Sequence, residues 1–232
     1  MKQVDKGILL YKTDFSESSW ILGIYTIEKG KKSFIFKGGK KKVKGLFPLG
    51  IYDFTYYQRP ESDLGLMESM QVAKPLLNLL NDPQRILIGF FVTDLLRQTL
   101  KTEYPDERLF IFLEEQIKLL NETEQLYHFP LTFVAGLIHQ LGYAPYSESD
   151  TPNFFDVQKG ILVHFPAISH SVEKFGTVQL IYELFEKEVE WKNFTKTVIR
   201  QTLQELLLHI KVHLPDVDVD KTLEIIKEVL YD

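Results

Sequence analysis

Cysteine does not occur in this chain of 232 residues. Its absence excludes disulfides, thiolate zinc sites and cysteine nucleophiles, and it fits a protein of the reducing cytosol. Long apolar runs are missing as well: the start of the chain is polar, and the run Ile8–Leu10 that follows is too short for a signal peptide. No run approaches the roughly 20 apolar residues needed to span a bilayer. These absences predict a soluble cytoplasmic protein without membrane contact.

Charge is distributed unevenly along the chain, whose formal net charge is −5. Residues 1–80 carry thirteen Lys and Arg against eight Asp and Glu, which leaves fourteen basic and 24 acidic residues for the remainder. A basic first third followed by an acidic remainder predicts two units with different partners.

The lysine stretch, Lys29–Lys44, holds eight lysines and no acidic residue in sixteen positions. Within it, Ser33–Phe36 has the β-branched and aromatic character of a strand, and Gly38-Gly39 predicts a turn. A strand that leads into a glycine turn rich in lysine suggests a finger that contacts phosphates, and a solvated surface hairpin is the alternative. The candidate residues are Lys29, Lys31, Lys32, Lys37, Lys40, Lys41, Lys42 and Lys44, with Phe34 and Phe36.

The first seventy residues have the pattern of a small barrel. Five short runs read as strands: Gly7–Lys12, Trp20–Thr26, Ser33–Lys37, Gly50–Tyr57 and Leu64–Ala73. Five strands this close together favour a closed barrel over an open sheet. Such barrels bind single-stranded nucleic acid by combining a basic groove with stacking aromatic rings. Candidate rings are Phe34, Phe36, Phe47, Tyr52, Tyr56 and Tyr57, and a place in the barrel core is the alternative for each.

Helical periodicity begins after Lys74-Pro75. Asp82-Pro83 predicts a helix start, with Asp82 as the N-cap. The predicted helices are Gln84–Lys101, Glu107–Leu120, Pro130–Leu141, Val172–Glu186, Phe194–Leu214 and Lys221–Tyr231, the last capped by Asp220. Between them, Tyr143–Gly160 is polar and long, as functional or mobile loops are. The predicted fold class is α+β, with a barrel domain over residues 1–75 and an all-α domain over residues 76–232.

Catalytic and metal-binding patterns are weak. The glycines of the lysine stretch lack the G-x-x-x-x-G-K-[ST] spacing of a nucleotide-binding loop. His209 and His213 lie four residues apart on a predicted helix, and His164 and His170 flank a Phe-Pro pair, but no further ligand completes either set. No Ser-His-Asp arrangement is evident. We therefore predict no enzyme activity, no metal and no cofactor. A metal-dependent nuclease is a further alternative that can be tested.

The helical part contains a possible basic spot for an acidic peptide. Its candidates, near the junction of the first two long predicted helices, are Arg85, Arg97, Lys101 and Arg108. Cations beside exposed apolar groups suit an acidic peptide tail. An ordinary solvated helix face is the alternative.

Gly7–Leu22 contains two strand-like runs around a D-x-x-E-x-S turn, and Thr26–Lys42 contains a hairpin and a basic loop. In these two stretches the chain resembles the RecO family of bacterial DNA repair proteins. Leu46–Leu49 matches an L-x-P step. Farther along, Leu137–Pro145 and Phe154–Gly160 match L-G-x-x-P and F-D-x-x-x-G. The matches follow one another in the family's order over nearly the whole chain.

This resemblance implies an N-terminal OB-fold, a C-terminal helical domain and no cofactor. It also implies binding of single- and double-stranded DNA, annealing of complementary strands, and location at the nucleoid. The implied partners are RecR, the acidic C-terminal tail of single-strand-binding protein (SSB), and, indirectly, RecA, which is loaded onto SSB-coated strands.

The family often carries four zinc-binding cysteines that are missing here. The corresponding positions fall in Tyr146–Asn153 and near His164–His170. This finger-like region, about residues 143–170, either folds without metal or is loose. We predict that it folds, through packing of Phe154, Phe155, Leu162 and Phe165.

Together these patterns predict a non-enzymatic recombination mediator whose basic barrel binds DNA and whose helical domain binds protein partners. A protein-interaction adaptor without direct DNA contact is the alternative.

Overall fold

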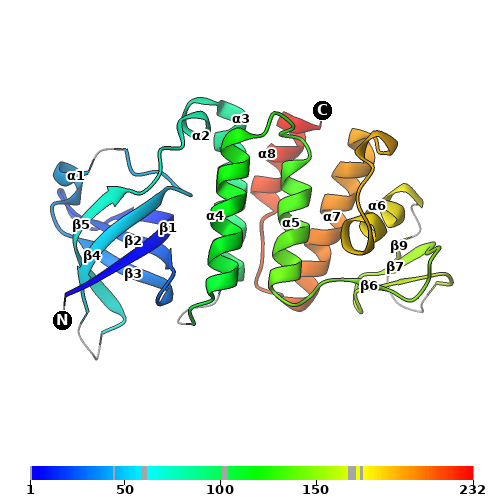
Figure 1. Ribbon diagram of the computed structural model, residues 1–232, viewed down its shortest axis with the longest axis horizontal. Coiled ribbons are helices and arrows are strands. Elements are labelled where there is room, and N and C mark those ends of the chain that lie inside the picture. The colour runs from blue at the N-terminus through cyan, green and yellow to red at the C-terminus, as the bar shows by residue number, and fades with distance from the viewer. Residues whose placement is uncertain are drawn as a thin grey trace. The chain divides into compact units, whose positions relative to one another are not determined.

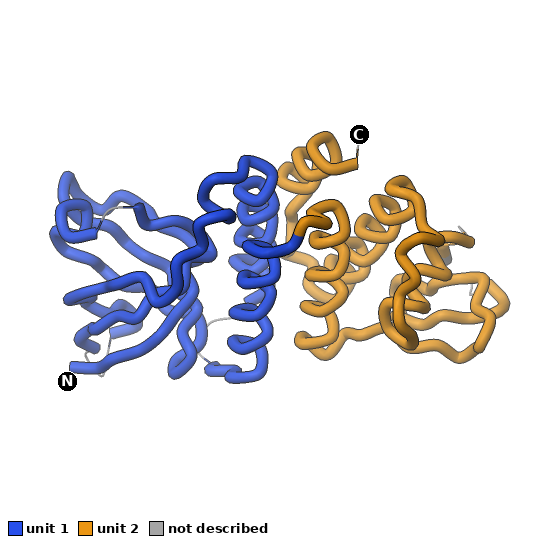
Figure 2. Tube along the Cα trace, turned by 45° about the horizontal axis from the view of Figure 1, so that its top comes forward, with its two compact units in different colours: residues 1–123 blue, residues 124–232 orange. Residues whose placement is uncertain are grey.

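The computed structural model describes residues 2–43, 45–58, 62–100, 104–166, 171–172 and 175–231. The chain forms two compact units, residues 1–123 and residues 124–232 (Figure 2). Within the described ranges, no helix is both long and apolar enough to cross a membrane.

Five strands of unit 1 form a closed barrel (Figure 1). They are β1 (Lys2–Asp14), β2 (Trp20–Thr26), β3 (Gly30–Phe36), β4 (Ile51–Tyr57) and β5 (Leu64–Val72). The hydrogen-bonded order is β1-β2-β3-β5-β4, with β4 closing onto β1, and only the β3–β5 pair is parallel. This is the arrangement of an OB-fold, so the predicted barrel is confirmed.

Alternation along the strands determines which side chains fill the barrel. Tyr52, Phe54 and Tyr56 are buried, as expected for alternate residues of one strand that face the same side. Phe34 from β3 meets the edges of Phe54 and Tyr56 at ring-centroid distances of 5.2 and 5.0 Å. Phe36 is also fully buried in this cluster. The interior of the barrel is therefore largely aromatic.

After the barrel strands, the described part of unit 1 continues with three helices: α2 (Leu77–Asn81), α3 (Pro83–Thr99) and α4 (Glu107–Glu122). The predicted cap is confirmed, because the Asp82 carboxylate accepts hydrogen bonds from the backbone N–H groups of Gln84 and Arg85. The short helix α2 was not predicted, since five residues carry too little periodicity. The compact unit thus includes helices that the sequence assigns to the helical part.

Helices α3 and α4 cover part of the barrel's outer surface. The ring of Tyr25 on β2 stacks against Phe110 of α4 at 6.2 Å. Lys6 on β1 forms an ion pair of 2.6 Å with Glu114 of α4. These contacts cover the outer face of β1 and β2 at the barrel end where Tyr25 lies.

In the described part of unit 2, four helices have eight or more residues: α5 (Phe129–Gln140), α6 (Phe175–Glu186), α7 (Lys196–His213) and α8 (Asp220–Leu230). A single 3-10 turn, η1 (Trp191–Asn193), lies between α6 and α7. Helices α5 and α6 both pack against α7. The prediction that Asp220 caps α8 is wrong: Val219 is the N-cap, and Asp220 is the first helical residue. There its charge faces the positive end of the helix dipole.

The described part of the finger-like region, together with residues 171–172, forms a small four-stranded sheet. Its strands are β6 (Tyr146–Ser147), β7 (Phe154–Asp156), β8 (Ile161–Val163) and β9 (Ser171–Val172), in the order β6-β8-β7-β9. Phe155 and Leu162 are fully buried, as predicted, and Phe154 is half-buried. Phe165 is 76% exposed, so its predicted packing role is wrong. It lies beyond the end of β8, where no strand pairing directs its side chain inward.

Candidate nucleic-acid interface

The lysine stretch is divided between the two ends of β3. Lys29 lies in the turn before β3, whereas Lys37 and the lysines of a short helical turn follow it. Seven strand residues at about 3.3 Å each span roughly 20 Å. One cluster in the sequence therefore becomes two in space. Lys44 lies outside the described residues.

Lys31 makes contacts within the unit. Its ammonium group donates to the backbone oxygens of Arg97 and Leu100, at 2.6 and 3.1 Å, at the C-terminal end of α3. Burial, with a smaller contribution from the Arg97 charge, lowers the pKa of Lys31. Because cations stabilise helix C-termini, Lys31 anchors α3 to the barrel. Its predicted contact with a phosphate stays a prediction, and the ammonium group would have to leave these carbonyls to make it. Lys32 is half-buried, and Lys29 is exposed.

The glycine pair of the lysine stretch starts a helical turn and not an extended finger. Gly38 has φ +67°, and α1 (Gly39–Lys42) follows it directly. A Cβ on Gly39 would lie 2.7 Å from the Phe36 ring, so only glycine lets the turn lie this close to the barrel. The predicted lysine finger is therefore a compact turn at one end of the barrel (Figure 1).

Helix α1 is attached to the loop between β1 and β2. The Lys40 N–H donates to the Ser18 carbonyl at 3.2 Å, and the Gly38 N–H donates to the Ser19 hydroxyl oxygen at 3.4 Å. The Lys40 ammonium forms an ion pair of 2.9 Å with Asp14, and the hydrogen bond from Lys40 lowers the pKa of Asp14. We call this surface the α1 pole: Lys12, the β1–β2 loop (residues 15–19), Trp20, Lys37 and Lys40–Lys42.

The cations of the α1 pole differ in how much they are engaged. Lys12 donates to the Leu46 carbonyl at 2.8 Å and lies 5.5 Å from the Trp20 ring. Lys42 donates to the Glu68 carbonyl at 3.3 Å. Lys37 and Lys41 are exposed and have no polar side-chain partner within the described part of the chain. These two lysines are therefore the most available for an anionic ligand.

Most of the aromatic rings that the sequence offers for base stacking are buried or half-buried. Phe34 and Phe36 are fully buried and present no ring face to a base, which corrects their predicted role in stacking. A closed barrel with alternating side chains places every second residue inside. Among the other candidates, Tyr52 and Tyr56 are also core residues, Phe47 is half-buried, and Tyr57 is 41% exposed.

Phe15, which the sequence did not single out, is 55% exposed in the α1 pole. It lies in a segment that the sequence identifies only as a turn. The one available signal was a bulky aromatic residue among small polar ones.

Among the basic residues predicted for peptide binding, the described ones do not form one spot. Arg85 donates to the backbone oxygens of Leu120 and Thr123 and pairs with Asp82, so it joins the start of α3 to the end of α4. Arg97 lies twelve residues along α3, roughly 18 Å away. Arg85 is therefore removed from the predicted set.

The remaining peptide candidates differ in their surroundings. The Arg97 guanidinium lies 5.0 Å from the Tyr11 ring. Arg108 is exposed in the first turn of α4, and Lys101 lies outside the described residues.

The paired histidines of α7 do not form a metal site. His209 is 1% exposed, and its Nδ1 and Nε2 atoms lie 2.8 and 2.9 Å from the carbonyl oxygens of Val157 and Tyr143. Neither nitrogen is then free to bind a metal together with His213. Among the described side chains, no group of three or more His, Cys, Asp or Glu residues could hold a metal ion. His170 lies outside the described residues.

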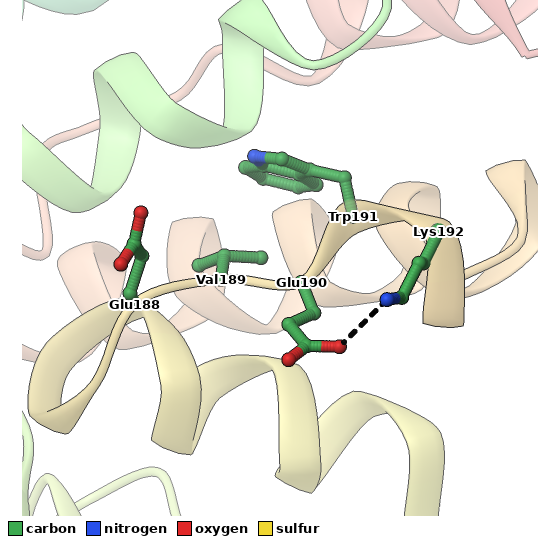
Figure 3. Close-up of a pocket in the computed structure, with 5 residues that line it drawn as sticks. All are labelled: Glu188, Val189, Glu190, Trp191 and Lys192. Atoms are coloured by element: carbon green, nitrogen blue, oxygen red, sulfur yellow. Dashed lines mark ion pairs between the residues drawn. The ribbon is translucent and has the colours of Figure 1, made fainter.

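A hollow of about 420 Å³ in unit 2 is lined by five consecutive residues, Glu188–Lys192 (Figure 3). Its Glu190 and Lys192 side chains form an ion pair of 3.4 Å. Trp191 stacks on His128, with ring centroids 4.2 Å apart. This short, mixed-charge segment has no nucleophile beside a base, and it offers less for binding an anion than the α1 pole does.

Comparison with known proteins gives consistent matches. Residues 1–76 match the family model described as "Recombination protein O N terminal", and residues 80–218 match "Recombination protein O C terminal". The DNA repair protein RecO of Phocaeicola vulgatus is 26% identical, and the alignment covers 99% of both chains. The protein of the same name from Flavobacterium psychrophilum is 25% identical, with 97% of both chains covered. That from Bacteroides fragilis is 23% identical over 99% of both chains.

Proposed function

The chain belongs to the RecO family of DNA repair and recombination proteins, and from that premise we propose that its α1 pole binds single- and double-stranded DNA. The observation that carries the proposal is the group of exposed lysines on α1 and at the end of β3, above all Lys37 and Lys41. Lysine ammonium groups contact phosphates without reading sequence, and each contact releases counterions. Such binding suits a protein that acts on any damaged strand.

The covered barrel surface supports the same location. OB-folds commonly bind nucleic acid on the face of β2 and β3 and on adjoining loops. Here Tyr25 and Lys31 on that face contact α4 and α3. The α1 pole, at the other end of β3, keeps exposed cations and a loop that opens to solvent. We infer that DNA crosses this end of the barrel.

Charge reversal at Lys37 and Lys41 tests DNA binding. The double variant Lys37→Glu/Lys41→Glu should weaken binding of a labelled 40-mer at least tenfold. It should also reduce the slope of log affinity against log salt by about 1.4 for single strands, which corresponds to two lost phosphate contacts. Fluorescence anisotropy at several salt concentrations measures both quantities.

The matched control is Lys29→Glu/Lys32→Glu, which changes the charge equally at the other end of β3. We expect the change in log affinity for this control to be less than a third of the change for Lys37→Glu/Lys41→Glu. Equal losses from both pairs would refute a localised interface. No loss from either would favour the alternative, an adaptor without direct DNA contact.

Family membership supports proposals for the remaining steps. We propose that the protein anneals complementary strands and acts with RecR to load RecA onto SSB-coated strands, without breaking bonds itself, at the nucleoid in the cytoplasm. We further propose that residues 1–75 serve DNA and residues 76–232 serve protein partners. Arg97 and Arg108 are the remaining described candidates for the acidic SSB tail. Binding of a labelled acidic peptide would test that contact.

A further inference from the structure

We propose that Phe15 stacks on an unpaired base, so that the α1 pole distinguishes single-stranded from double-stranded DNA. This inference rests on the proposed function of the same surface. It assigns to the Phe15 side chain a role in specificity that the lysines do not have.

The β1–β2 loop holds the Phe15 ring in an open position. The ring is 55% exposed and makes no ring contact within the described part of the chain. The Phe15 and Ser16 N–H groups both donate to the Ser19 carbonyl, at 3.0 and 3.3 Å, and the Ser19 N–H donates back to the Ser16 carbonyl. A closed turn of this kind fixes the backbone under the ring. Less ordering entropy is then lost when a base binds.

The ring and the lysines belong to one surface. Asp14, the residue before Phe15, forms an ion pair with Lys40, and the Ser18 carbonyl accepts from the Lys40 N–H. Base stacking on an aromatic ring beside a basic groove is the general means by which proteins bind single strands. A strand whose phosphates follow α1 therefore has a base within reach of the loop.

The acidic residues near Phe15 indicate on which side of the ring the DNA backbone would lie. Lys40 forms an ion pair with Asp14, the last residue of β1, whereas the exposed Glu17 of the loop has no cationic partner in the described ranges. Phosphates avoid an uncompensated carboxylate. The backbone accordingly runs on the α1 side, and the bases point toward Phe15.

Duplex DNA cannot use the ring in this way. Its bases already stack on their neighbours and pair across the helix, and exposing a base face costs a few kcal/mol. The lysines contact phosphates of either form. Phe15 should thus contribute to single-strand binding alone.

Replacement of Phe15 by alanine tests the inference. We expect Phe15→Ala to raise the Kd for a 30-nucleotide single strand about 5- to 140-fold, the range for one lost stacking contact. The Kd for the matched duplex should change less than twofold. Anisotropy at one fixed salt concentration gives both values. Phe15→Trp should keep single-strand affinity, because indole also stacks.

Phe90→Ala is the matched control, since Phe90 is a 50% exposed phenylalanine on α3 in the same unit. It should change neither affinity. A strand carrying 2-aminopurine reports stacking directly, and its fluorescence should be quenched by the parent and less by Phe15→Ala.

Equal losses for single strand and duplex with Phe15→Ala, or no loss for either, would overturn the inference. Failure of the proposed function has a different signature. In that case Lys37→Glu/Lys41→Glu would leave both affinities unchanged, whatever Phe15→Ala does.

Discussion

At the scale of single residues, His209 shows how one buried side chain can connect distant segments. Its ring nitrogens lie within hydrogen-bonding distance of the carbonyls of Val157 and Tyr143, which are 52 and 66 residues away in sequence. Which of the two ring nitrogens donates depends on the tautomer of the ring. His209 thereby ties α7 to both ends of the segment that contains β6 and β7.

Replacing this residue should loosen unit 2. We expect His209→Leu to lower the free energy of unfolding by roughly 1–3 kcal/mol, because leucine cannot donate a hydrogen bond to either carbonyl. Urea denaturation followed by circular dichroism measures the loss. His213→Leu is the control: this ring stacks on Tyr143 at 4.8 Å, is half-buried and has no such pair of carbonyls among the described residues. A smaller loss for His209→Leu than for His213→Leu would contradict the assigned role.

At the scale of elements, Glu114 attaches α4 to the barrel. Its carboxylate pairs with Lys6 of β1, Lys74 and Lys118, at 2.6, 3.3 and 3.0 Å. Burial alone would raise the pKa of Glu114, but hydrogen bonds and charges from these lysines lower it to about 2 from an ordinary value of 4.5. The carboxylate is therefore more stable in the folded unit than in the unfolded chain.

This pKa sets the direction of an acid dependence. A lowered carboxyl pKa contributes stability that is present above about pH 4.5 and is lost as the pH falls toward about 2. Glu114→Gln should lower the free energy of unfolding by roughly 1–3 kcal/mol at pH 7. Its stability should also fall less between pH 5 and 3. Urea titrations at both pH values measure the difference.

Glu115→Gln is the natural comparison, because Glu115 is exposed on the same helix. We expect it to behave like the parent protein at both pH values. An unchanged acid dependence in Glu114→Gln would show that other carboxyl groups control the unfolding of this unit.

At the scale of the whole molecule, mutations should separate DNA binding from binding of an acidic peptide. Lys37→Glu/Lys41→Glu should lose DNA affinity and keep binding of an acidic peptide. Arg97→Glu/Arg108→Glu should show the reverse, with peptide affinity reduced about tenfold or more, because like charges then face each other. Anisotropy with labelled DNA and labelled peptide measures both pairs. If either double variant lost both ligands, one shared surface would replace the proposed division.

Much of the fold was predictable because it depends on neighbours in sequence. Alternation in β4 placed Tyr52, Phe54 and Tyr56 on one face, and Asp82-Pro83 identified the start of α3. The small sheet at β6–β9 was not predicted, since strands of two or three residues have no measurable period.

The site was predictable only in part. The sequence located the lysines, but the roles of Lys31 and Arg85 depend on carbonyl groups far along the chain. Lys31 contacts a residue 66 positions away, and Arg85 contacts one 38 positions away. No local pattern indicates such partners.

The sequence by itself determined the absence of thiol chemistry, the barrel and helical parts, and the concentration of lysine around Gly38-Gly39. These follow from composition and from side-chain periodicity over a few residues. The tertiary structure alone decided which lysines remain exposed, that Phe34 and Phe36 form the core, and that Phe15 faces solvent beside α1. The reason is physical: exposure and hydrogen bonding depend on which distant groups the closed barrel and its helices bring together.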